Sequence, residues 1–170
     1  MPVPPWLLIL IPLLVVNLVI NPSERDFTWY RSLKRPGWMG IDPWVPAAWF
    51  VISVSFYFST LAFWRANGNW RWVATYAALL VLLRSHQWMI CRLRNLAAGL
   101  PFWLLSWTLT LILALIVRPA SPLAAWLLVP VLVWTPAEAV VDLQMIGLNR
   151  QQHRSGREPH DRRPARSRRL

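Results

Sequence analysis

Long apolar stretches, separated by short polar gaps, constrain this chain more than any other feature. Five such stretches cover roughly residues 4–21, 44–65, 70–91, 101–118 and 123–148. Each is close to the length of about 20 mostly apolar residues that a helix needs to cross a bilayer. A soluble helix would confine its apolar residues to one face, and the strands of an outer-membrane barrel would alternate them with polar ones. The pattern therefore predicts an all-α membrane protein, a bundle of five transmembrane helices.

Basic residues are distributed unevenly over the gaps between these stretches. The gap 22–43 carries four, the gap 92–100 carries two and the segment after residue 149 carries eight, fourteen in all. With five spans these segments share one side of the membrane, and the other side has Arg65, Arg71 and Arg118. Cytoplasmic segments carry an excess of Lys and Arg. We therefore expect an inner or plasma-type membrane, with the N-terminus outside and the C-terminus cytoplasmic.

Composition divides the chain into two parts. Residues 1–149 hold the five expected spans, and the first span lacks the basic start and small-residue cleavage site of a signal peptide. Residues 150–170 are rich in Arg, Pro and Ser and show no apolar periodicity. We expect this tail to be disordered and to lie on anionic lipid at the cytoplasmic side. Nucleic-acid binding is not expected, because the tail has no Phe, Trp or Tyr among its charges.

Two motifs lie near the ends of the predicted bundle. Residues 29–38 read Trp-Tyr-Arg-Ser-Leu-Lys-Arg-Pro-Gly-Trp, and residues 121–134 read Ser-Pro-Leu-Ala-Ala-Trp-Leu-Leu-Val-Pro-Val-Leu-Val-Trp. They resemble the motifs Trp-Tyr-x-x-Leu-x-Lys/Arg-Pro-x-Trp and Ala-Ala-x-Leu-Leu-x-Pro-Tyr-Leu-x-Trp of the TspO/MBR family, which comprises tryptophan-rich sensory proteins and mitochondrial translocator proteins. The resemblance covers about residues 5–149 and includes the closing pair Leu148 and Asn149.

The resemblance implies a receptor or carrier for a flat amphipathic ligand, a tetrapyrrole such as a porphyrin or haem, in a sensory or regulatory role. The two tryptophans that line the family's pocket correspond to Trp49 and Trp134. Trp38, which ends the first motif, and Trp88, on the third stretch, are further candidate ligand-binding residues. Some members degrade porphyrin in light with the two pocket tryptophans, so an enzyme using Trp49 and Trp134 in this way is one alternative. Another is a ligand-free membrane scaffold that recruits partners through the basic tail.

Charged residues inside the apolar stretches need partners, because an isolated charge at the bilayer centre costs at least about 2.5–3.5 kcal/mol. Arg84 and His86 interrupt the third stretch, and Glu138 and Asp142 lie in the fifth. Trp134, Glu138 and Asp142 recur at every fourth position and should share one helix face. One interpretation is an ion pair between Arg84 and Glu138 or Asp142 that fixes packing. The other is a polar pocket floor, in which Arg84 and His86 receive the acidic groups of a ligand.

The resemblance also shows where this pocket departs from the family. Glu138 and Asp142 stand where the family has Ala and Asn, so the pocket wall carries more charge here. His86 is a further candidate, as an axial ligand of a haem. No metal-binding cluster, phosphate-binding loop or catalytic nucleophile motif occurs in the sequence. We expect no required cofactor and no metal. The expected partners are the lipid bilayer and a tetrapyrrole-like molecule such as porphyrin or haem, and a homodimer stays open.

Prolines and the other tryptophans complete the sequence pattern. Pro130 and Pro136 interrupt the fifth stretch, and each removes a backbone hydrogen bond, so we expect this helix to bend around Trp134. Most remaining tryptophans lie near the ends of the stretches, as in the aromatic belt at a membrane surface. The single cysteine, Cys91, excludes a disulfide within the chain.

Overall fold

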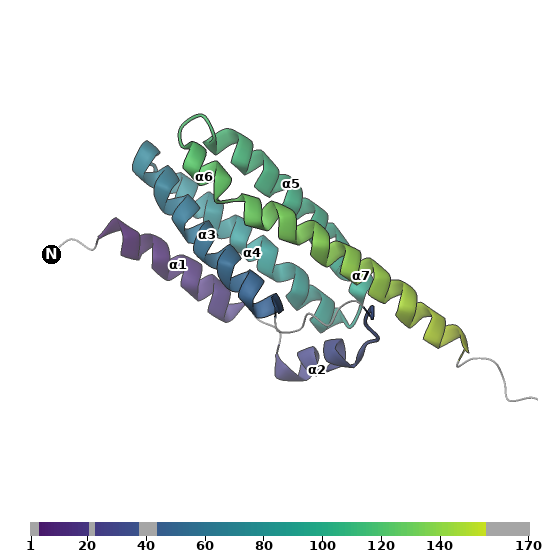
Figure 1. Ribbon diagram of the computed structural model, residues 1–170. Helices are drawn as coiled ribbons and strands as arrows, with labels where there is room; N and C mark the ends of the chain where they lie inside the picture. Colours follow the sequence, from purple (N-terminus) through teal and green to yellow (C-terminus); the bar gives the residue numbers. More distant parts are fainter. Residues whose placement is uncertain (1–3, 21–22, 38–43, 156–170) are drawn as a thin grey trace, which may run out of the picture.

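The computed structural model describes residues 4–20, 23–37 and 44–155, and every regular element in these ranges is a helix (Figure 1). In chain order the elements are α1 (Pro5–Val19), α2 (Glu24–Ser32), α3 (Trp44–Asn67), α4 (Trp70–Leu93), the 3-10 turn η1 (Leu96–Gly99), α5 (Leu100–Val117), α6 (Pro122–Trp126) and α7 (Val129–Ser155). The long helices α1, α3, α4, α5 and α7 lie side by side in one bundle, and α2 packs against α4 at one end of it. The predicted all-helical fold is confirmed.

Length and composition identify the helices that can cross a membrane. Within the described residues these are Val45–Asn67, Leu96–Val117 and Pro122–Asn149, with a fourth if α1 and α2 form one broken span. α4 has 24 residues, but the polar run at 84–87 lowers its hydropathy. α1 has 15 residues, which makes it about 22 Å long and shorter than the bilayer core. The chain is an integral multi-pass membrane protein, and the count of five spans stays a prediction.

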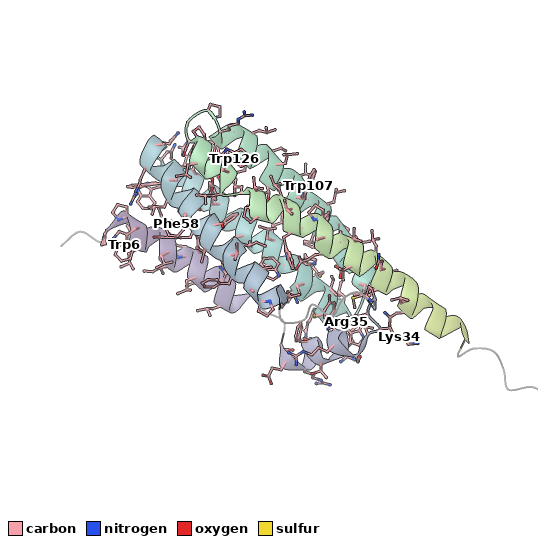
Figure 2. All side chains as sticks on the ribbon, viewed as in Figure 1. Trp6, Lys34, Arg35, Phe58, Trp107 and Trp126 are labelled. Carbon is pink, nitrogen blue, oxygen red and sulfur yellow. The ribbon has the colours of Figure 1, made fainter. Side chains whose placement is uncertain are left out.

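Large apolar side chains cover the outside of the bundle. Leu18, Phe50, Trp126 and Val133, from four different helices, are each about two-thirds exposed or more. Such an apolar surface is unusual for a soluble monomer and suits contact with lipid. Figure 2 shows Trp6 and Trp126 towards one end of the bundle and Lys34 and Arg35 at the other.

Short capped turns bring neighbouring helices together. α3 and α4 are joined through Gly68, whose φ of 69° favours glycine, and Asn69, whose side chain accepts a hydrogen bond from the Arg71 N–H at 2.9 Å. Deeper in the bundle, the Ser59 hydroxyl lies 2.8 Å from the Tyr76 hydroxyl and donates to the Ala124 carbonyl at 2.7 Å. These buried bonds join α3, α4 and α6, and they satisfy polar groups that lipid could not.

The fifth apolar stretch is broken rather than continuous. α6 ends at Trp126 and α7 begins at Val129. The prediction that Pro130 interrupts a helix is therefore wrong: Pro130 lies in the first turn of α7, where its missing N–H leaves no helical bond unmade. Pro136 does lie inside α7 and removes the bond to the Leu132 carbonyl. The indole N–H of Trp107, on α5, donates to that carbonyl at 3.1 Å.

The last helix extends beyond the last apolar span, which ends at Asn149. α7 continues to Ser155, past residue 149, where we expected the membrane domain to end and the tail to begin. The first residues of the expected tail are thus helical. The rest of the tail, residues 156–170, lies outside the described residues.

Candidate functional site

A cavity of about 490 Å³ lies at the end of the bundle where α2 packs. α2 and the segment after it contribute Phe27, Tyr30, Arg31 and Arg35, the start of α3 contributes Val45 and Pro46, α4 contributes His86, Gln87 and Ile90, and α7 contributes Trp134, Ala137, Glu138, Val141 and Asp142. Most of these side chains are apolar or aromatic, and a few polar groups converge among them. This mixture is typical of sites for small amphipathic molecules.

One face of α7 forms a wall of this cavity. Trp134, Glu138 and Asp142 all line it, as expected for residues spaced four apart on a helix. Trp134 lies towards the middle of the bundle, and Asp142 lies beside α2. Glu138 is between them, so a carboxylate occupies the middle of the wall.

Glu138 is bonded to one of the two tryptophans that the family resemblance singles out. The Trp49 indole N–H donates to Glu138 Oε1 at 3.0 Å. Trp134, one turn earlier on α7, faces the same carboxylate, but its N–H makes no hydrogen bond of normal geometry. Glu138 Oε2 is also buried without a hydrogen-bond partner in the described part of the chain. Buried polar groups are nearly always bonded, so this carboxylate has capacity for a further donor.

Trp49 is buried beside the cavity rather than among the residues that line it. The Arg84 guanidinium lies over its ring, 4.2 Å from the ring centroid, while the N–H edge points to Glu138. A cation over an indole face is attracted by the ring electrons. Both the face and the edge of Trp49 are therefore held by protein groups.

Arg84 also lies outside the cavity lining, and its partner differs from the one we expected. Arg84 Nε donates to Asn17 Oδ1 at 2.9 Å, and a second guanidinium nitrogen donates to the same oxygen. The predicted direct ion pair with Glu138 or Asp142 is therefore not formed, although the charge of Glu138 still acts on Arg84. Arg84 and His86 are two positions apart, about 200° around a helix. Arg84 consequently faces α1 and α3, whereas His86 faces α7.

The ion pair of this site joins His86 to Asp142. His86 Nε2 lies 3.5 Å from Asp142 Oδ2, and the Tyr30 hydroxyl donates to Asp142 Oδ1 at 3.5 Å. Asp142 is 4 % exposed, so these two neighbours supply polar contacts that water would otherwise make with its carboxylate. An imidazole whose Nε2 faces a carboxylate does not offer that nitrogen to a haem iron. No cluster of three or more metal-ligating side chains occurs among the residues described.

The segment after α2 is attached to the end of α7. Asn149 Oδ1 accepts from the Lys34 N–H and Asn149 Nδ2 donates to the Lys34 carbonyl, both at 3.1 Å. This pairing links the first sequence motif to the closing Leu148 and Asn149. It positions Arg35 beside the cavity, where its guanidinium lies over the Tyr30 ring, 5.7 Å from the ring centroid.

The remaining predicted residues do not join this group. Trp88 is 41 % exposed and does not line the cavity, because it shares the helix face of Arg84 and not that of His86. Trp38 lies outside the described residues. Sequence reasoning missed Asn17 and Tyr30 as partners of the charged groups. The available signals were the amide in the interior of the first apolar stretch and the aromatic pair that opens the first motif.

Another cavity, of about 250 Å³, lies between α4 and α5. Its lining is apolar except for Thr75 and the indole of Trp72, and it holds no titratable side chain. It offers no charged group that could orient an amphipathic molecule. The cavity beside α2 is therefore the better candidate site.

Comparison with known proteins agrees with the two sequence motifs. No curated protein matches the chain. The sequence model of the TspO/MBR family matches residues 7–147, a range that includes every residue lining the cavity beside α2. Because the match extends over most of the chain, this membrane protein belongs to the TspO/MBR family.

Proposed function

We propose that this protein is a membrane receptor or carrier that binds a flat amphipathic ligand in the cavity beside α2. The observation that carries the proposal is the cavity itself. At about 490 Å³ it lies within the range of small-molecule sites, and Trp134, a tryptophan of the second motif, is in its wall. Family membership supports the general role of a membrane receptor or carrier.

A tetrapyrrole, porphyrin or haem, is the ligand class that the family resemblance favours. The aromatic and aliphatic lining would contact the flat face of such a molecule. Arg31 and Arg35, at the α2 side of the cavity, would meet its acidic groups. In this role the protein would sense or regulate through the ligand that it holds.

Orientation in the membrane follows from the basic residues. The cavity lies beside α2. This helix belongs to the segment 22–43, whose four basic residues we assign to the cytoplasmic side of the membrane. With five spans the N-terminus is then outside. The ligand would enter or leave at the cytoplasmic end of the bundle.

Ligand binding is supported better than light-driven catalysis by two indoles. Trp134 lines the cavity, but the ring face and N–H of Trp49 are occupied by Arg84 and Glu138. A ligand in the cavity would therefore meet one of the two indoles directly. We propose binding, and not porphyrin degradation, as the function of this site.

A protoporphyrin titration of the purified protein tests the proposal, with pigment absorbance as the measurement. Trp134→Ala should weaken binding about tenfold, because it removes the indole face that the pigment would contact. Trp126→Ala is the matched control, since Trp126 is 72 % exposed and lies on α6, away from the cavity. Equal affinity in wild type and Trp134→Ala would contradict the proposed site.

A further inference from the structure

The cavity has an unevenly distributed charge that the proposed function does not explain. Glu138 lies in its wall with Oε2 unbonded, and Trp134, beside it, has an N–H without a hydrogen bond of normal geometry. The nearest cations are otherwise engaged: Arg84 binds Asn17 and lies on Trp49, and His86 pairs with Asp142. The inner wall therefore presents a carboxyl group that interacts with the charges of His86 and Arg84 but makes no direct ion pair with either in the described part of the chain.

The α2 side of the cavity carries the opposite charge. Arg31, an exposed residue, and Arg35 both line it there. Arg31 lies over the Phe27 ring, 4.6 Å from its centroid, which keeps the guanidinium beside the cavity. A molecule entering from this end meets cations first and the Glu138 carboxylate last.

We infer that the cavity selects flat ligands that carry an N–H donor, best a cationic nitrogen, at the end that enters first. This inference rests on the proposed function, because it names the ligand class of the same site. The ligand nitrogen donates to Glu138 and lies against the Trp134 ring. A carboxylate forms a stronger hydrogen bond with a charged donor than with a neutral one, and a cation over an indole face adds to that attraction.

The same geometry disfavours a ligand that enters with an acidic group leading. A ligand carboxylate near Glu138 would add a like charge to a wall that already holds Glu138 and Asp142. Acidic groups belong instead at the trailing end, where Arg31 and Arg35 lie. The ligand is thus oriented by charge, with its basic end inward and its acidic end towards α2.

Two flat probes of nearly equal size and opposite charge test this inference. The probes are 9-aminoacridine, a cation, and acridine-9-carboxylate, an anion, each titrated into the protein in a neutral detergent with probe fluorescence as the measurement. Wild type should bind the cation at least about tenfold more tightly, the effect of one charge-assisted hydrogen bond. Arg31→Gln should weaken only the anion, which binds with its carboxylate outward.

The decisive variant is Glu138→Gln. Its amide oxygen still accepts from Trp49, but its NH2 group faces the cavity as a donor, so the preference for the cation should disappear or reverse. Glu24→Gln is the matched control, because Glu24 is exposed on α2 and does not line the cavity. If the Gln variant unfolds at a lower temperature than wild type, the test is repeated with Glu138→Ala, which also lacks the carboxylate.

A third variant separates failure of this inference from failure of the proposed function. Ala137→Trp places a ring in the cavity and should exclude both probes. If both probes are excluded by Ala137→Trp but bind wild type and Glu138→Gln with equal affinities, the inference is wrong and the site stands. If neither probe responds to Ala137→Trp, the cavity is not the binding site, and both proposals are wrong.

Discussion

Glu138 is the carboxylate in the middle of the α7 wall of this site. It accepts a hydrogen bond from the Trp49 N–H at 3.0 Å. Arg84 over the Trp49 ring and Asn17 beyond Arg84 extend the contact from α7 through α3 and α4 to α1. Trp49 thus acts in this structure as a connection between two charged groups, and its indole N–H should matter for stability.

Trp49→Phe tests that role. The change keeps an aromatic ring under Arg84 but leaves Glu138 Oε1 without its donor, which should cost about 1–3 kcal/mol. We expect a lower midpoint of thermal unfolding in detergent. Trp126→Phe, at an exposed position on α6, should change the free energy of unfolding by less than about 0.5 kcal/mol. If the two variants have the same midpoint of thermal unfolding, the hydrogen bond from Trp49 to Glu138 does not contribute to stability.

The pair Asn17 and Arg84 gives a second prediction. Asn17→Leu alone should destabilise by about 1–3 kcal/mol, because the Arg84 guanidinium loses its acceptor inside the bundle. The double variant Asn17→Leu, Arg84→Met replaces both polar partners with apolar groups and should recover most of that loss. A double-mutant cycle read by thermal unfolding measures the coupling. Additive losses in the double variant would show that the two side chains do not depend on each other.

α7 shows how a membrane helix accommodates an internal proline. Pro136 leaves the Leu132 carbonyl without its helical donor, and the Trp107 indole N–H of α5 bonds to it at 3.1 Å. An unbonded carbonyl in lipid costs several kcal/mol, so partner helices commonly satisfy such groups. The bond also fixes how α5 and α7 face each other, and α7 forms the main wall of the cavity.

Trp107→Phe should therefore destabilise the bundle by about 1–3 kcal/mol, because it leaves the Leu132 carbonyl unbonded. Adding Pro136→Ala returns a backbone N–H to that carbonyl and should restore most of the stability. Thermal unfolding of the two single variants and the double variant measures this rescue. A double variant no more stable than Trp107→Phe would show that the indole acts by packing and not through the carbonyl.

Over the whole molecule, the features that depend on local sequence patterns could be predicted better than the contacts between helices. The helical class, the family and the common face of Trp134, Glu138 and Asp142 follow from composition, motifs and the 3.6-residue period. The partner of Arg84 depends on how α4 is rotated against α1 and α7, and one sequence does not contain that angle. The break before Pro130 likewise depends on where α6 ends, and the sequence marks it only with a proline, which can either interrupt a helix or begin one.

The distribution of basic residues predicts the orientation of the whole chain. A fluorescent protein fused after Leu170 should be bright in intact cells, because it folds in the cytoplasm, and an alkaline phosphatase fused there should be inactive. The same two reporters inserted between Gly68 and Asn69, in the turn between α3 and α4, should give the opposite result. Phosphatase activity at the C-terminus would overturn the five-span orientation.

The most direct test of the site is whether filling the cavity beside α2 abolishes pigment binding. Ala137 lines the cavity on α7, and Ala137→Trp would occupy it with a ring; Ala74→Trp makes the same change at an exposed position on α4 outside it. In protoporphyrin titrations we predict that Ala74→Trp binds like wild type and that Ala137→Trp loses at least about tenfold in affinity, or 1.4 kcal/mol. Binding by Ala137→Trp equal to that of wild type would contradict the assignment of the cavity as the ligand site.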